Sequence, residues 1–121
     1  GIPNIYNQID VLVRVDCSYG YSFPTLEAAS CAKPVIVTNM GIDHHITEAG
    51  GGIMMSKEPR EYLYKGKELA KEVREAVIYM RDHPIKRREM GMNGRDEILR
   101  NWQWSHHINN WRKFLREATK A

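Results

Sequence analysis

The feature that most constrains the fold is a pair of short aliphatic runs separated by a segment of helix length. Residues 10–16 and 34–38 are β-branched and nearly continuously apolar, which is the pattern of strands buried on both faces. The residues between them, 23–31, are typical of a helix, and a third strand is predicted over 52–55, directly after a glycine-rich turn. This strand, helix, strand, strand series predicts an α/β fold with a Rossmann-like open parallel sheet.

The second half of the chain is predicted to be helical from Glu61 onward. An apolar stripe ends before Pro84, and two further helices are expected over 87–102 and 105–118. The stripe consists of Leu69, Ala70, Val73, Ala76, Val77 and Met80. We therefore divide the 121 residues, which suffice for one domain, into a sheet part over 1–56 and a helical part over 57–121.

Composition and charge exclude several classes of protein. With 42% hydrophobic and 27% charged residues, the chain falls outside the disordered class. No apolar run approaches the roughly 20 residues that span a bilayer. Two cysteines, Cys17 and Cys31, without Cys-x-x-Cys spacing favour a reducing cytoplasm. Residues 1–56 carry a net charge of −3 and residues 57–121 one of +6, but glutamates alternate with the basic residues, which favours solvated helix faces over nucleic-acid binding.

Histidine is the residue that first suggests a metal site in this sequence. His44 and His45 are adjacent, as are His106 and His107, and neighbours on a helix or strand cannot both face one ion. No His-x3-His or Glu-x-x-His spacing accompanies them. No metal site is predicted.

The sharpest local feature is the loop from Cys17 to Glu27, which follows the first strand and enters the predicted helix with Pro24 in its first turn. Free backbone N–H groups at such a helix start form a ready site for an anion. Two interpretations of Glu27 remain open. Its carboxylate could bind the hydroxyl groups of a sugar or ribose resting there, or it could only complement the helix dipole, worth about 0.3–1 kcal/mol.

This stretch resembles the nucleotide-binding domain of the GT-B-fold retaining glycosyltransferases, the group that contains glycosyltransferase family four. That group has a Ser-x-x-Glu-Gly-Phe-Gly-like loop followed by Leu-Glu-Ala-x-Ala-x-Gly-x-Pro-Val-Ile, where residues 18–36 read SYGYSFPTLEAASCAKPVI. The resemblance extends to residues 5–11 (IYNQIDV), 39–42 (NMGI) and 48–54 (EAGGGIM), and to the C-terminal helices. It covers nearly the whole chain and is specific to the family, not to a member.

The resemblance implies a nucleotide-diphosphate sugar donor, such as a UDP- or GDP-sugar, and no metal or other cofactor. Glu27 would hold the ribose hydroxyls, and backbone amides between Ser22 and Thr25 would receive the diphosphate, Pro24 having no N–H to give. The donor-binding set implied in this way is Gly20, Tyr21, Ser22, Phe23, Thr25, Leu26 and Glu27, with Ser18 and His44 as further candidates.

The sequence departs from the family pattern at three positions, one of which is His44, where the family's Gly-Gly-x-Pro-Glu loop often has a glutamate. Tyr19 stands where the first glutamate of the Glu-x7-Glu motif contacts the donor sugar, so it occupies the catalytic position without the acid. Ala32 stands where a helix-ending glycine is usual, which costs about 1 kcal/mol if the residue is left-handed.

Two functions from different classes remain open. The chain could be a fragment of a retaining hexosyl-type transferase, apparently truncated, whose N-terminal acceptor-binding domain lies outside it. It could instead be a non-catalytic nucleotide-binding or assembly module. The isolated fragment is expected to be inactive and to self-associate, and a peripheral membrane contact of the full protein at the inner face of a membrane stays open.

Overall fold

A computed structural model describes residues 2–15, 23–102 and 104–119. Its centre is a parallel sheet of three short strands in the order β1-β2-β3, comprising β1 (Leu12–Arg14), β2 (Val35–Val37) and β3 (Gly52–Met54). Val13 pairs with Ile36, and Ile36 with Ile53. The expected α/β class with an open parallel sheet is confirmed, although each strand is shorter than the apolar run that predicted it.

The predicted strand, helix, strand, strand order is wrong at one point, because a helix, α3 (Gly41–Glu48), lies between β2 and β3. A crossover is physically required here, since parallel neighbours cannot be joined by a tight turn. The predicted glycine-rich turn at 50–52 is confirmed, but it connects the end of α3 to the start of β3. Gly50 in this turn has a φ of 84°.

The remaining helices agree closely with the sequence pattern from residue 23 onward. They are α1 (Ile2–Tyr6), α2 (Phe23–Ser30), α4 (Gly66–Asp82), α5 (Pro84–Asn101) and α6 (Trp104–Thr119). One difference concerns Glu61, predicted to open a continuous helix. It belongs instead to a short 3-10 helix, η1 (Pro59–Tyr62), and a turn separates η1 from α4.

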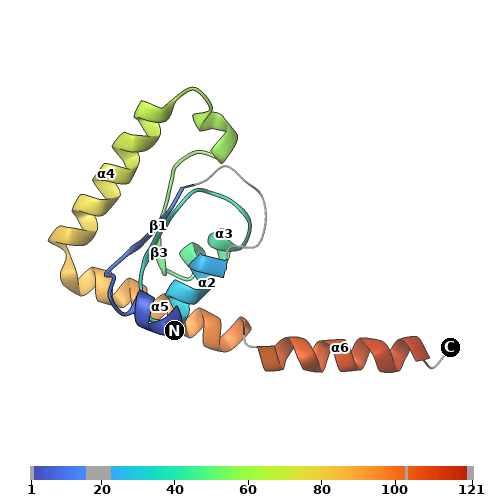
Figure 1. Cartoon of the computed structure of the whole chain (residues 1–121). Helices are drawn as coiled ribbons and strands as arrows, with labels where there is room; N and C mark the ends of the chain where they lie inside the picture. Colours follow the sequence, from blue (N-terminus) through green and yellow to red (C-terminus); the bar gives the residue numbers. More distant parts are fainter. Residues whose placement is uncertain (1, 16–22, 103, 120–121) are drawn as a thin grey trace.

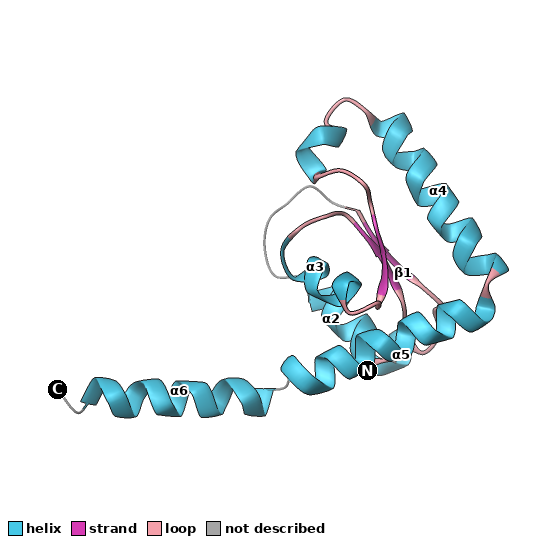
Figure 2. Ribbon diagram, turned by 180° about the vertical axis from the view of Figure 1, so that it is seen from behind, coloured by secondary structure: helices cyan, strands magenta, loops and turns pink. Residues whose placement is uncertain are grey.

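Each face of the sheet is covered by its own apolar cluster. Val35 and Val37 pack on one side with Ile46 of α3, whereas Ile36 packs on the other side with Met80 of α4. Figure 2 shows α4 on one side of the strands and α2 with α3 on the opposite side. β2 is thus buried on both faces, as its continuous apolar run predicted.

The apolar stripe predicted on α4 is only partly buried. Ala76 and Met80 are buried, and Leu69 and Val73 are partly buried against the same cluster. Val77, in contrast, keeps 44% of its surface exposed. The helix contacts the sheet along a narrower line than the stripe, so the outer apolar positions face solvent.

The turn after α2 explains two small residues far apart in the sequence. Ala32 has a φ of 57°, so the residue that stands in place of the family's usual glycine is left-handed. The helix α5 passes directly over this turn, where a Cβ on Gly91 would lie 2.1 Å from the carbonyl oxygen of Ala32. Glycine at position 91 therefore permits the close approach of α5 to the turn at Ala32.

The last helix, α6, extends away from the body of the molecule (Figure 1). Trp111, Phe114 and Leu115 on it are 62%, 60% and 55% exposed. Trp102, just before α6, is partly buried against the core instead. In the ranges that the structure describes, no helix combines the length and apolarity needed to cross a membrane.

Candidate functional site

The buried polar side chains of the described residues gather at one edge of the sheet. Thr25, Thr38 and Asp43 are between 0 and 1% exposed. Thr25 lies in the first turn of α2, Thr38 follows β2 directly, and Asp43 lies in the first turn of α3. Because α2 and α3 follow β1 and β2, all three lie where the parallel strands end, the edge at which open α/β sheets bind their ligands.

Arg14 belongs to the same edge. It is the last residue of β1, and its Nη1 lies 2.9 Å from Oδ2 of Asp43, with the two side chains 16% and 1% exposed. The main chain is tied there too, since the Thr38 N–H donates to the Arg14 carbonyl at 3.3 Å. Oδ1 of Asp43 is buried and has no hydrogen-bond partner in the described part of the chain. The strand β1 is only partly buried, so the prediction that the run 10–16 is covered on both faces is wrong. The ion pair accounts for the arginine at the end of this strand.

The predicted donor-binding residues are only partly covered by the described ranges. Ser18, Tyr19, Gly20, Tyr21 and Ser22 lie outside the described residues.

Three more of the predicted residues open α2. Phe23 begins the helix and is 66% exposed, whereas the Thr25 side chain is buried and Leu26 packs partly against the core. The buried Thr25 side chain leaves only the main chain of that residue to meet a ligand.

Glu27 has a partner that the sequence did not indicate. Its Oε2 accepts a hydrogen bond of 2.8 Å from the hydroxyl of Tyr6, which ties α1 to α2. The helix dipole acts most strongly within the first turn of a helix. Glu27 is the fifth residue of α2 and lies beyond that turn, which weakens the interpretation that it complements the dipole. A carboxylate has two acceptor oxygens, and Tyr6 bonds one of them.

The pKa of the Tyr6 hydroxyl is affected by this contact. Burial first, and then the hydrogen bond to Glu27, raise the pKa of Tyr6 from 10.0 to about 12. A folded-state pKa above the unfolded value means that the buried, neutral Tyr6 contributes stability below about pH 10, and that this contribution is lost between about pH 10 and 12.

Tyr6→Phe is therefore expected to lower the free energy of unfolding at pH 7 by about 1–3 kcal/mol, because Glu27 loses a buried donor. The same change should flatten the loss of stability between pH 10 and 12. Urea unfolding at pH 7 and across the alkaline range measures both effects. A variant with parental stability and an unchanged alkaline profile would contradict a stabilising role for this hydrogen bond.

His44 lies on α3 and not in a loop at a strand end. Its Nε2 is 2.8 Å from Oε1 of Glu48, one turn further along the helix. Its Nδ1 is buried and without a hydrogen-bond partner among the residues described. The neighbouring His45 faces the ring of Trp102 at 5.6 Å, so the two histidines point to different surroundings, as expected for adjacent helical residues. Among the described residues, no group of three His, Cys, Asp or Glu side chains could hold a metal.

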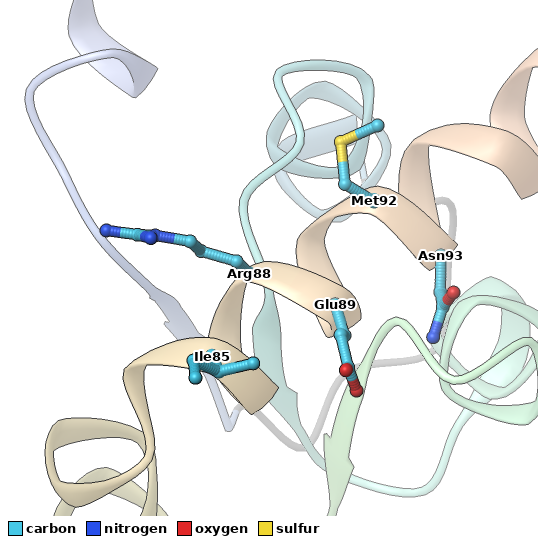
Figure 3. Close-up of a pocket in the computed structure, with 5 residues that line it drawn as sticks. All are labelled: Ile85, Arg88, Glu89, Met92 and Asn93. Atoms are coloured by element: carbon cyan, nitrogen blue, oxygen red, sulfur yellow. The ribbon is translucent and has the colours of Figure 1, made fainter.

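A shallow hollow lies elsewhere, on the outer face of α5 (Figure 3). It is lined by Ile85, Arg88, Glu89, Met92 and Asn93. Figure 3 shows Arg88 and Glu89 pointing away from each other and Met92 pointing away from both, so the two charged side chains do not converge on one ligand position. The hollow comes from α5 alone and is separate from the carboxyl edge of the strands.

The open parallel sheet, with helix starts and buried polar groups at its carboxyl edge, defines the chain as a Rossmann-like α/β domain. The sequence profile of the glycosyl transferase-like family matches residues 2–113, so the chain belongs to that family. This confirms the resemblance drawn from the motifs. No curated protein matches the chain in sequence.

Among solved structures, a sucrose-phosphate synthase from Thermosynechococcus elongatus has a similar fold, with a TM-score of 0.76 and 20% sequence identity. The match covers 96% of this chain, including its C-terminal helical part, and 27% of the synthase. At this identity the match establishes the fold, and this chain spans about a quarter of the length of the larger GT-B enzyme.

Proposed function

We propose that this chain is part of the donor-binding half of a glycosyltransferase and that it binds a nucleotide-diphosphate sugar at the carboxyl edge of its sheet. One observation carries the proposal: the buried polar side chains of the described residues, Thr25, Thr38 and Asp43, lie together where β1 and β2 end and α2 and α3 begin. Membership of the glycosyl transferase-like family supports the choice of ligand.

In this proposal the start of α2 receives the diphosphate and Glu27 receives the ribose. The first-turn N–H groups of a helix lack partners within the helix, and the positive end of its dipole favours an anion. Glu27 lies one turn further along, held by Tyr6 at one carboxylate oxygen. The second oxygen can accept from a ribose hydroxyl, so Tyr6 would orient the group that reads the ribose.

Transfer of the sugar, in the proposed retaining reaction, needs stabilisation of the departing diphosphate. The helix start supplies this electrostatically and without a metal, since its N–H groups already point to the site before the bond breaks. The acceptor would be held by an N-terminal domain outside this chain, because transfer requires donor and acceptor in register.

A second candidate is a non-catalytic nucleotide-binding module, and Tyr19 favours it. This residue stands where the related enzymes place the glutamate that contacts the donor sugar. Nucleotide binding is common to both candidates, so the first experiment tests binding.

Glu27→Gln is expected to weaken the binding of UDP or GDP about tenfold and to change the binding of inorganic pyrophosphate less than twofold, because the carboxylate is assigned to the ribose. Glutamine keeps an acceptor for the Tyr6 hydroxyl, so the link to α1 is retained. Titration followed by amide chemical shifts gives the affinity and the location. Glu89→Gln, an exposed carboxylate on α5, is the matched control.

The shifts caused by either nucleotide should fall on the first turn of α2 and on residues near the strand ends. Shifts confined to α5 and α6 would contradict the location of the site. Equal losses for nucleotide and pyrophosphate would contradict the role of Glu27.

A further inference from the structure

The ion pair between Arg14 and Asp43 joins two elements that are separate in the sequence. Arg14 ends β1, and Asp43 lies in the first turn of α3, which follows β2. Their 2.9 Å contact therefore bridges the ends of two neighbouring strands on the side where the donor is proposed to bind. It is also the most deeply buried of the salt bridges between described residues, with Asp43 1% exposed.

A need for stability does not account for a pair so deeply buried. Both charges lose their hydration, and an apolar pair of similar volume commonly stabilises a protein as well or better. Asp43 adds to this cost, since its Oδ1 is buried without a hydrogen-bond partner in the described ranges. An ion pair differs from an apolar contact in one useful respect: its hydrogen bond is directional, so it fixes the two groups in one geometry.

The main chain also links the two segments at this edge of the sheet. The carbonyl oxygen of Arg14 accepts the N–H of Thr38, so the ends of β1 and β2 are joined by a backbone bond while the side chain of Arg14 reaches on to α3. Arg14 thus makes contacts to both segments that follow it at this edge. The result is a fixed spacing between the end of β1 and the start of α3.

We propose that Arg14 and Asp43 are positioning residues for the nucleotide site, holding the end of β1 and the first turn of α3 in the arrangement that the donor requires. The inference rests on the proposed function, because it presumes that a nucleotide binds at this edge. Neither residue is required to touch the ligand. Their part is to keep the two chain segments at the edge from shifting relative to each other.

The test compares the full 121-residue chain with a double variant, Arg14→Met with Asp43→Leu, which replaces the ion pair by an apolar pair. We expect this variant to unfold at the midpoint of the parent or above it, and to bind UDP and GDP at least tenfold more weakly. Lys86→Gln with Glu89→Gln, which removes an exposed pair on α5, is the matched control and should keep both properties.

Binding within twofold of the parent by the folded double variant would overturn the inference. If the double variant does not fold, the single variant Asp43→Asn tests the inference instead. Asparagine has nearly the volume of aspartate and keeps one carbonyl oxygen as an acceptor, but it carries no charge. A tenfold loss of nucleotide affinity with parental unfolding supports the inference, and unchanged affinity overturns it. A parent chain that binds neither UDP nor GDP overturns the proposed function and this inference together, whereas a binding parent with equally binding variants overturns the inference alone.

Discussion

Replacing Gly91 by alanine is expected to lower the free energy of unfolding by about 3 kcal/mol or more, which corresponds to roughly 10 °C or more in the midpoint of thermal unfolding. The added Cβ would lie 2.1 Å from the carbonyl oxygen and 2.9 Å from the carbonyl carbon of Ala32. Both atoms are main chain, and Ala32 is already in a left-handed conformation with a φ of 57°. Because these are main-chain atoms, no rotation of a side chain can relieve the clash, and α5 must move away from the turn that follows α2.

Gly66→Ala is the control, because Gly66 is also a helical glycine, the first residue of α4, and a Cβ there meets nothing within 4 Å. Its effect should lie between zero and a gain of about 1 kcal/mol. Chemical denaturation followed by circular dichroism measures both variants. Equal stabilities for the two alanine variants would contradict the close packing of α5 over the turn at Ala32.

Some of the fold could be predicted because the relevant signal is local. The run Val35–Val37 is apolar at every position. Such a run predicts a strand buried on both faces, even when the elements that cover it are unknown. The left-handed conformation of Ala32 was indicated by the resemblance instead, because the residue stands where the family usually has a helix-ending glycine.

The helix α3 was missed because its local signals are weak. Met40 at its N-cap makes no side-chain capping bond, and the segment GIDHHITE has few apolar residues to show a helical period. Gly50 was noticed, but a glycine run signals a turn equally well after a helix or before a strand. The topology supplies the missing constraint, since adjacent parallel strands require a crossover.

The candidate site was predictable in its location but not in its contacts. The loop after β1 and the start of α2 identified the carboxyl edge of the sheet. The Arg14–Asp43 and Tyr6–Glu27 contacts join residues 29 and 21 positions apart, and no periodicity in a single sequence carries such information. In the helical half, Lys86 and Glu89 form an ion pair three residues apart, a spacing that a single sequence can indicate. Lys57 and Glu68, eleven residues apart, form one that it cannot.

The apolar surface of α6 leads to the prediction with the largest expected effect on assembly. Trp111, Phe114 and Leu115 are each more than half exposed, and the rings of Trp111 and Phe114 meet edge to face at 5.9 Å. Within the described sheet, β1 is an edge strand, and Val13 on it is 42% exposed. Exposed apolar groups on a projecting helix and an unpaired strand edge both favour association between copies.

The 121-residue chain is therefore expected to self-associate as its concentration rises, and changing Trp111, Phe114 and Leu115 together to glutamine should lower the association constant a hundredfold or more. Burying a large apolar side chain contributes about 1.5–3 kcal/mol, so the loss of three exceeds the roughly 3 kcal/mol that a hundredfold change requires. Glutamine has nearly the helix propensity of leucine, which should keep α6 helical.

Sedimentation equilibrium over a wide concentration range measures the association, and glutamine at Asn109, Asn110 and Lys113 on the same helix gives a control with the same number of changes. Those three side chains are exposed and polar, so their replacement should leave the association constant within about threefold. Association that persists in the variant lacking Trp111, Phe114 and Leu115 would move the contact to the β1 edge. A chain that stays monomeric at every concentration would show that these exposed residues do not bind one another, in which case the apolar face of α6 requires a different partner.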